Sequence, residues 1–293
     1  MSDRLDWDRD GSDWPNRKSS RFVTAAGLRW HVQRMGAGPC LLLAHGTGAS
    51  THSWRDLAPL LARHFTVLAP DLPGHGFTDM PAFHQMSLPS MAKLLQALLD
   101  ELGDRPQVAV GHSAGAAILA RMCLDGALTP QRLISMNGAL LPIGGVAGKV
   151  FSPLAKLLAS SSVPARLFAL RAGDRTMVLK LLRDTGSRID ATGAELYARL
   201  ARNPGHVGAA LAMMANWELG SLSRALPKLK TPLVLVAGSN DRTIPSADAY
   251  RVHAMLPSAN VLRLKGLGHL AHEEQPYTVT DLILKSARIA RSP

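Results

Sequence analysis

One serine of this chain stands in a setting that suits a nucleophile. Residues 111–115 read Gly-His-Ser-Ala-Gly, so Ser113 has a glycine two positions away on either side. An apolar run at 108–110 precedes this pattern, and a run of small residues typical of a buried helix follows it. A sharp strand-to-helix turn of this kind exposes the serine hydroxyl and tolerates only small neighbours. The pattern predicts that Ser113 attacks a carbonyl carbon; the alternative is a glycine-rich structural turn.

The second residue that could take part in catalysis is a histidine near the C-terminus. A serine hydroxyl is a weak nucleophile until a base removes its proton. The base is expected after the last strand, where residues 266–269 read Gly-Leu-Gly-His. The glycines would allow the loop that carries His269 to lean back toward Ser113. His272 is the alternative base, but it is expected to point into the helix that follows. We therefore predict His269.

A carboxylate is needed to fix the tautomer and the orientation of this base. Asp241 follows the apolar run at 232–237 through the turn Gly-Ser-Asn. The end of the strand near residue 137 offers a second position, but Asn137 stands there, and a neutral amide does not stabilise an imidazolium as a carboxylate does. We therefore predict Asp241 as the acid and expect Asn137→Ala to have little effect.

An oxyanion hole requires two backbone N–H groups aimed at the developing negative charge. The N–H of Ala114, directly after the nucleophile, is one predicted donor. The second is expected in the His-Gly-Thr-Gly segment at 45–48, at Thr47, although that segment could also be an ordinary turn. His112 and Trp54, which lie beside these motifs in the sequence, are predicted to contact the substrate.

The elements around these residues alternate between strands and helices. A hairpin is predicted at 22–32, and the helix at 88–102 has leucines at helical spacing and a glycine stop at 103. Strands that are apolar throughout and alternate with helices indicate an α/β fold with a mostly parallel, twisted sheet covered on both faces. The predicted strands are 40–44, 65–69, 107–110, 133–136, 232–237 and 260–264, and further helices are expected after residue 54, at 114–124 and at 277–289.

The alternation stops near residue 138 and resumes near 231. Residues 139–230 have a helical pattern with Gly and Pro interruptions, which predicts a helical cap inserted into a core made of 21–138 and 231–293. Residues 1–20 are polar and rich in Asp and Arg, and they are predicted to form a mobile tail. The alternative is that Trp7 and Trp14 dock against the rest of the protein.

Composition limits the class of protein. Hydrophobic residues make up 46% of the 293 residues and charged residues 19%, so the chain can bury a sizeable core. No apolar run is long enough for a membrane span, and the N-terminus has no secretory signal pattern, so we expect a cytoplasmic protein. Cys40 and Cys123 are expected to be free thiols. No metal or cofactor is predicted.

The net charge of +11 is concentrated in the middle of the chain. Residues 139–230 hold 13 Lys and Arg against five Asp and Glu, which accounts for +8 of the total. This charge is either a solvated helical surface or an attraction for an anionic substrate, partner or membrane surface. Nucleic acid is not expected, because aromatic residues are few and no recognised binding module is present.

Several motifs together resemble the α/β-hydrolase superfamily. They are the segments at 45–48, 111–115, 238–241 and 268–269, together with Asp-Leu-Pro-Gly-His-Gly-Phe-Thr at 71–78, and the resemblance runs from about residue 22 to the C-terminus. More narrowly, the segments at 13–17, 27–33 and 48–57 resemble a subgroup from phototrophic bacteria, labelled the magnesium-chelatase accessory protein of bacteriochlorophyll synthesis.

The residues and the resemblance lead to one functional prediction with alternatives. Ser113, His269 and Asp241 predict a serine hydrolase that acts on an ester, with C–C bond cleavage as another possibility. The narrower resemblance implies a tetrapyrrole carboxylic ester as substrate and contact with magnesium chelatase or, peripherally, with the anionic inner membrane. The alternative is an accessory or porphyrin-binding protein that assists magnesium chelatase without turnover.

Overall fold

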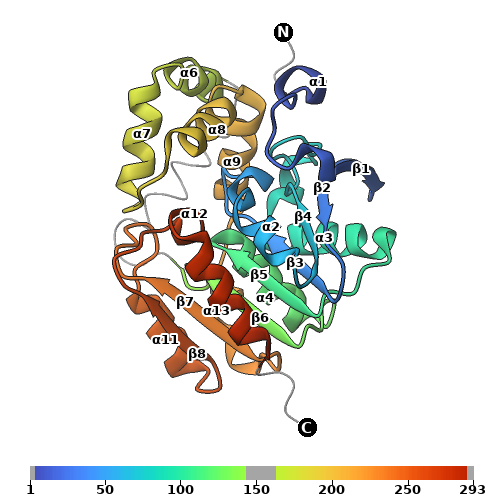
Figure 1. The fold of residues 1–293 in the computed structure, drawn as a ribbon, viewed down its shortest axis with the longest axis vertical. Helices are drawn as coiled ribbons and strands as arrows, with labels where there is room; N and C mark the ends of the chain where they lie inside the picture. The colour runs from blue at the N-terminus through green and yellow to red at the C-terminus, as the bar shows by residue number, and fades with distance from the viewer. Residues whose placement is uncertain (1–3, 143–162, 289–293) are drawn as a thin grey trace.

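The computed structural model describes residues 4–142 and 163–288, which are built around an eight-stranded sheet (Figure 1). The strand order is β1-β2-β4-β3-β5-β6-β7-β8. β1, β2 and β4 pair antiparallel, whereas the neighbours from β4 to β8 are parallel, so the predicted mostly parallel sheet is confirmed. The strands are β1 (Ser20–Ala25), β2 (Leu28–Met35), β3 (Cys40–Ala44), β4 (Thr66–Pro70), β5 (Val108–His112), β6 (Arg132–Met136), β7 (Leu233–Gly238) and β8 (Asn260–Leu264).

Side chains of the central strands are buried on both faces of the sheet. In β3, Leu42 and Ala44 join the core on one face, and Leu41 and Leu43 join the core on the other. Successive side chains of a strand point to opposite faces, so a strand covered on both sides reads as a continuous apolar run.

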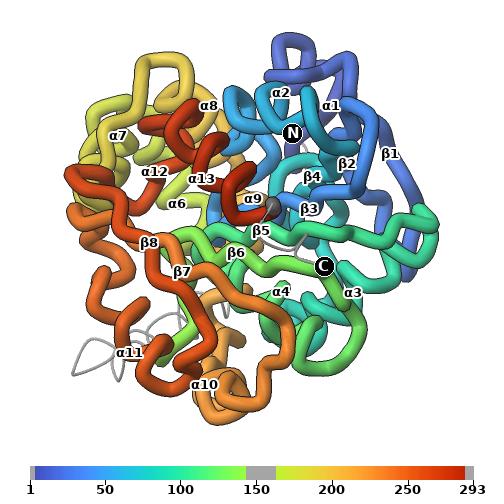
Figure 2. Tube along the Cα trace, turned by 60° about the horizontal axis from the view of Figure 1, so that its bottom comes forward, coloured from blue at the N-terminus to red at the C-terminus, as the bar shows by residue number. Residues whose placement is uncertain are grey.

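Helices cover the two faces, as the predicted architecture requires (Figure 2). One face packs against α3 (Leu88–Leu102), α4 (Ala114–Leu124) and α11 (Ala247–Met255), and the other against α2 (Leu57–Leu61), α12 (Ala271–Glu274) and α13 (Pro276–Arg288). The carboxyl ends of parallel strands lie along the same edge of a sheet. The loops after β3, β5, β6, β7 and β8 therefore gather at one edge.

The described chain between β6 and β7 is helical. It contains α6 (Val163–Arg171), α7 (Arg175–Asp184), α8 (Ala191–Ala201), α9 (Pro204–Asn216) and α10 (Gly220–Ala225). α6, α7 and α8 lie together at the upper left of Figure 1, and α9 packs against α6, α8 and the short helix η3 (Phe83–Met86). Lys149 and Lys156 of the predicted cap lie outside the described residues.

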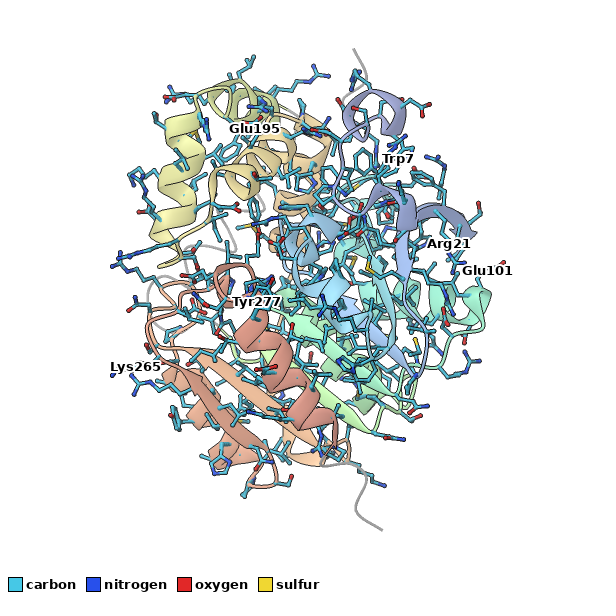
Figure 3. The ribbon with its side chains drawn as sticks, viewed as in Figure 1. Trp7, Arg21, Glu101, Glu195, Lys265 and Tyr277 are labelled. Atoms are coloured by element: carbon cyan, nitrogen blue, oxygen red, sulfur yellow. The ribbon has the colours of Figure 1, made fainter. Side chains whose placement is uncertain are left out.

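The prediction of a mobile tail at residues 1–20 is wrong for the described part of that segment. It contains α1 (Trp7–Asp10), and the Trp14 side chain is buried and donates its indole N–H to Thr51 Oγ1 at 3.1 Å. Trp7, labelled in Figure 3, packs edge-on against Phe77. The two tryptophans are the anchors that the sequence offered as the alternative, and their large apolar surfaces stabilise the docked segment.

No described helix has the length and apolar character that crossing a membrane would require. Cys40 and Cys123 are free thiols, as predicted, and burial raises the pKa of each to about 11.

Candidate active site

Ser113 occupies a strained turn between β5 and α4. Its φ of 51° and ψ of −117° fall in a region that non-glycine residues seldom adopt and that is frequent at functional sites. A Cβ on Gly111 would lie 2.5 Å from the backbone of Ala116, and one on Gly115 would lie 2.2 Å from the carbonyl oxygen of Ala44. Both positions therefore require glycine, and Ser113 itself is half-buried at the tip of the turn.

The predicted base and acid are hydrogen-bonded to each other. His269 Nδ1 lies 2.8 Å from Asp241 Oδ2, and the two side chains are 7% and 1% exposed. Asp241 Oδ1 accepts the backbone N–H groups of Thr243 and Ile244 at 2.8 and 2.9 Å. Because a carboxylate only accepts, His269 Nδ1 carries the hydrogen and Nε2 is the nitrogen left to take a proton.

The two alternative residues are engaged elsewhere. The Asn137 amide donates to the carbonyl oxygens of Gly268 and His269 at 2.9 and 2.8 Å, so it holds the loop that carries the base rather than the imidazole ring. His272 is buried, and its Nε2 lies 2.8 Å from Ser53 Oγ. These contacts favour Asp241 and His269 over the alternatives.

The two predicted oxyanion donors lie on loops that meet beside Ser113. A Cβ on Gly46 would lie 3.0 Å from Ser113 Cβ, which shows how closely the 45–48 loop approaches the serine. Neither the Thr47 N–H nor the Ala114 N–H has a backbone hydrogen-bond partner among the described residues. The Thr47 hydroxyl donates to the sulfur of Met213 in α9 at 3.4 Å, so a cap helix supports this loop.

The positions of His112 and Trp54 do not favour the prediction that they contact the substrate, which stays a prediction. Their side chains are buried, at 2% and 0% exposure, and are used within the core. His112 Nε2 lies 2.9 Å from the carbonyl oxygen of His269, and the ring of Trp54 packs on that of His272 at 4.5 Å between centroids. Both residues brace the loop that carries the base.

A turn of the region between β6 and β7 also contacts the loops that carry Asp241 and His269, and the sequence did not reveal it. The turn lies between α7 and α8. The carbonyl oxygen of Thr185 accepts the backbone N–H groups of Arg242 and His269 at 3.1 and 3.4 Å. The hydroxyl of Ser187 accepts the N–H of Leu270 at 2.8 Å. This turn therefore supports the loops of Asp241 and His269 directly.

A buried polar network connects α12 to the cap. Glu273 accepts hydrogen bonds from Arg55 Nη1, Tyr197 Oη and Ser53 Oγ, each at 2.7 Å. Tyr197 belongs to α8, so this network anchors the cap close to the loop of His269. Burial raises the pKa of Glu273, whereas Arg55 and the hydroxyl donors favour its charged form.

The other histidines near the site are buried and uncharged at neutral pH. Burial lowers the pKa of His206 to about 4 and that of His272 to about 3, and it places the pKa of His112 well below its ordinary value. His206 Nε2 donates to the carbonyl oxygen of Gly48 at 3.1 Å, which adds a second support to the oxyanion loop.

The arrangement offers a serine at a strained turn, an oriented imidazole and two backbone donors near the serine. These are the parts required for nucleophilic acyl transfer. Within residues 4–142 and 163–288, no cluster of three or more His, Cys, Asp or Glu side chains is arranged to hold a metal ion.

Comparison with known proteins places the chain in a family. The chain belongs to the family described as alpha/beta hydrolase fold, whose sequence profile matches residues 39–276. It is also 41% identical over 279 residues to the "Magnesium-chelatase 30 kDa subunit" of Rhodobacter capsulatus, covering 93% of this chain and 96% of that protein. Both resemblances read from the sequence motifs are thereby confirmed.

More distant relatives show a range of hydrolases. A 2-hydroxy-6-oxo-2,4-heptadienoate hydrolase from Pseudomonas putida is 28% identical over 273 residues, covering 89% of this chain and 93% of that protein. Among solved structures, an alpha/beta hydrolase fold protein from Burkholderia ambifaria matches with a TM-score of 0.75 and 25% identity, over 91% of this chain and 99% of that one. A putative lipase from Acinetobacter baumannii matches with a TM-score of 0.77 over 99% of both chains, and at 20% identity it shows the fold alone.

Proposed function

We propose that this protein is a serine hydrolase that transfers the acyl group of a carboxylic ester to water. Ser113 Oγ attacks the ester carbonyl carbon while His269 Nε2 takes its proton. Asp241 stays ionised and stabilises the imidazolium. The N–H groups of Thr47 and Ala114 stabilise the oxyanion.

The intermediate collapses when His269 returns the proton to the departing alcohol. A water molecule then attacks the acyl-serine by the same route and releases the acid. The observation that carries this proposal is the 2.8 Å bond from His269 to the buried side chain of Asp241, at the sheet edge where Ser113 occupies its strained turn. No step requires a cofactor.

For the substrate we propose a carboxylic ester of a tetrapyrrole in bacteriochlorophyll synthesis. The support is the 41% identity to a protein named as a magnesium-chelatase subunit, together with the basic cap, which would attract a ligand that carries carboxylates. The relative from Pseudomonas putida supports C–C cleavage as the other reaction that the same triad could perform.

The second candidate function is an accessory role in which the protein assists magnesium chelatase, or holds a porphyrin, without turnover. The name of the Rhodobacter capsulatus relative favours it. The test adds purified protein to two assays: hydrolysis of a porphyrin methyl ester, followed by chromatography, and magnesium insertion by chelatase. Hydrolysis that is lost in Ser113→Ala supports the enzyme. Stimulation of chelatase that survives in Ser113→Ala, with no hydrolysis by the wild type, supports the accessory role and refutes the enzyme.

A surface feature favours peripheral contact with an anionic membrane. Val163, Leu167 and Leu170 are 57%, 58% and 76% exposed and fall on one face of α6. α6 contains no acidic residue, and Arg171 is exposed at its end. Apolar side chains bordered by cations suit the headgroup boundary of a bilayer with anionic lipids.

A further inference from the structure

Asn137 joins the loop of the acid to the loop of the base. It follows β6, is 4% exposed and has a left-handed φ of 45°. Its Oδ1 accepts the backbone N–H of Gly238 at 2.7 Å, three residues before Asp241. Its Nδ2 donates to the carbonyl oxygens of Gly268 and His269 at 2.9 and 2.8 Å. One buried side chain therefore connects the ends of three neighbouring parallel strands.

The partners of this side chain require an amide. Two carbonyl oxygens can only accept, so the atom that faces them must donate two hydrogens, and only the NH₂ of Asn137 provides these. A carboxylate of the same shape would place an oxygen at 2.8–2.9 Å from both carbonyl oxygens. This explains why an amide occupies the position that could otherwise have held the acid. The expectation that Asn137→Ala has little effect took no account of these bonds.

A second side chain donates a hydrogen bond to the carbonyl oxygen of His269. His112 Nε2 lies 2.9 Å from the carbonyl oxygen of His269, so it must carry hydrogen and donate. The base loop is therefore fixed at its backbone by two side chains and at its imidazole by Asp241.

We infer that Asn137 is a positioning residue that sets the distance and angle between His269 and Asp241. The inference rests on the proposed function for its kinetic consequence. Asn137 touches no reacting atom, so its loss should lower kcat and leave KM nearly unchanged. Displacement of a reacting group by about 1 Å lowers rates by roughly 10²-fold, and we expect a decrease of about 10- to 100-fold in kcat.

The test compares three variants with the wild type. Asn137→Asp keeps the shape and replaces the donor, whereas Asn137→Gly removes the side chain and tolerates the left-handed backbone. Asn203→Asp is the matched control. Asn203 is also buried, and its Oδ1 accepts the N–H of His206 at the start of α9, so an aspartate there keeps this hydrogen bond. Thermal unfolding establishes that each variant folds.

Two measurements are made on each variant. The first is kcat and KM on a short ester, with the pH profile of kcat. The second is the downfield proton NMR signal of the His269 Nδ1–H, assigned by its loss in Asp241→Asn, which does not depend on turnover. We expect both Asn137 variants to have a lower kcat and a shifted or broadened signal. We expect Asn203→Asp to keep the kcat and the signal of the wild type. An unaltered signal and an unaltered kcat in Asn137→Asp would overturn the inference. If the wild type has no esterase activity but the Asn137 variants still change the signal, the proposed function is refuted and the inference stands.

Discussion

Substitution of Gly186, in the turn between α7 and α8, should strongly lower the activity of the protein. Gly186 has a φ of +84°, and a Cβ there would lie 1.9 Å from the carbonyl oxygen of Asn240. Real Cβ contacts shorter than 3.0 Å are essentially absent, so Gly186→Ala must push the two backbones apart by roughly 1 Å. Asn240 directly precedes Asp241, so this shift acts on the acid. Misplacement of that size lowers rates by on the order of 10²-fold, and we expect kcat to fall by about this factor.

A matched substitution separates this clash from backbone strain. Gly126 has a φ of +74° and nothing within 4 Å of its Cβ position. Alanine in a left-handed conformation destabilises the folded state by about 1–2 kcal/mol at either position. Gly126→Ala should therefore lower the unfolding temperature and leave kcat intact, whereas Gly186→Ala should lower both. The assay is kcat on a short ester at a temperature where both variants are folded. Equal kcat values would show that the cap turn does not support the acid.

Three further predictions concern Asp241, the buried His206 and the exposed apolar face of α6. Asp241→Asn should lower kcat by on the order of 10⁴-fold, by analogy with serine proteases, because the amide favours the wrong imidazole tautomer. If Asp241→Asn keeps the kcat of the wild type, another residue is the acid. Burial lowers the pKa of His206 to about 4 in the folded state, whereas this histidine binds a proton below about pH 6.5 in the unfolded chain. Protonation therefore favours the unfolded state between pH 6.5 and 4, and the free energy of unfolding should fall by about 3 kcal/mol over this range because of His206. Urea unfolding at each pH should show a flatter profile in His206→Gln, and an unchanged slope would contradict the assignment. Leu167→Ser combined with Leu170→Ser should reduce co-sedimentation with vesicles that contain phosphatidylglycerol. The control Tyr277→Ser, at an exposed residue of α13, should not reduce it. If the protein binds neutral and anionic vesicles equally at low and at high salt, electrostatic attraction to the anionic lipid is refuted.

Local patterns predicted much of the core from the sequence. The strand at residues 40–44 and the helix at 114–124 have the bounds that were predicted, because a short apolar run between turns and a helix opened by a glycine pattern are strong local signals. The parallel order of the strands followed from their uniform apolarity, which reports burial on both faces. The hydrogen bond between His269 and Asp241 could be anticipated because loops after parallel strands meet at one edge.

Supports that depend on long-range contacts were not predicted. Polar composition predicted a mobile N-terminal segment with Trp14 as a possible anchor, but the buried partner of Trp14 is Thr51, 37 positions away, which local patterns do not identify. The turn at Thr185 meets His269 across 84 positions of chain, and no periodicity encodes such a contact. Asn137 was judged only as a possible acid, because its role follows from which carbonyl oxygens surround it. The side chains that support a site cannot be identified from local sequence, because their roles depend on tertiary contacts.

The most direct test of the central claim is covalent labelling by an alkyl fluorophosphonate, followed by mass spectrometry of the peptides. The reagent reacts with a serine only when a base activates the hydroxyl and an oxyanion hole receives the phosphoryl oxygen. The account predicts one label per chain, on Ser113, with none on Ser113→Ala and much slower labelling of His269→Ala. A folded wild type that remains unlabelled, or that carries its label on another serine, would contradict it.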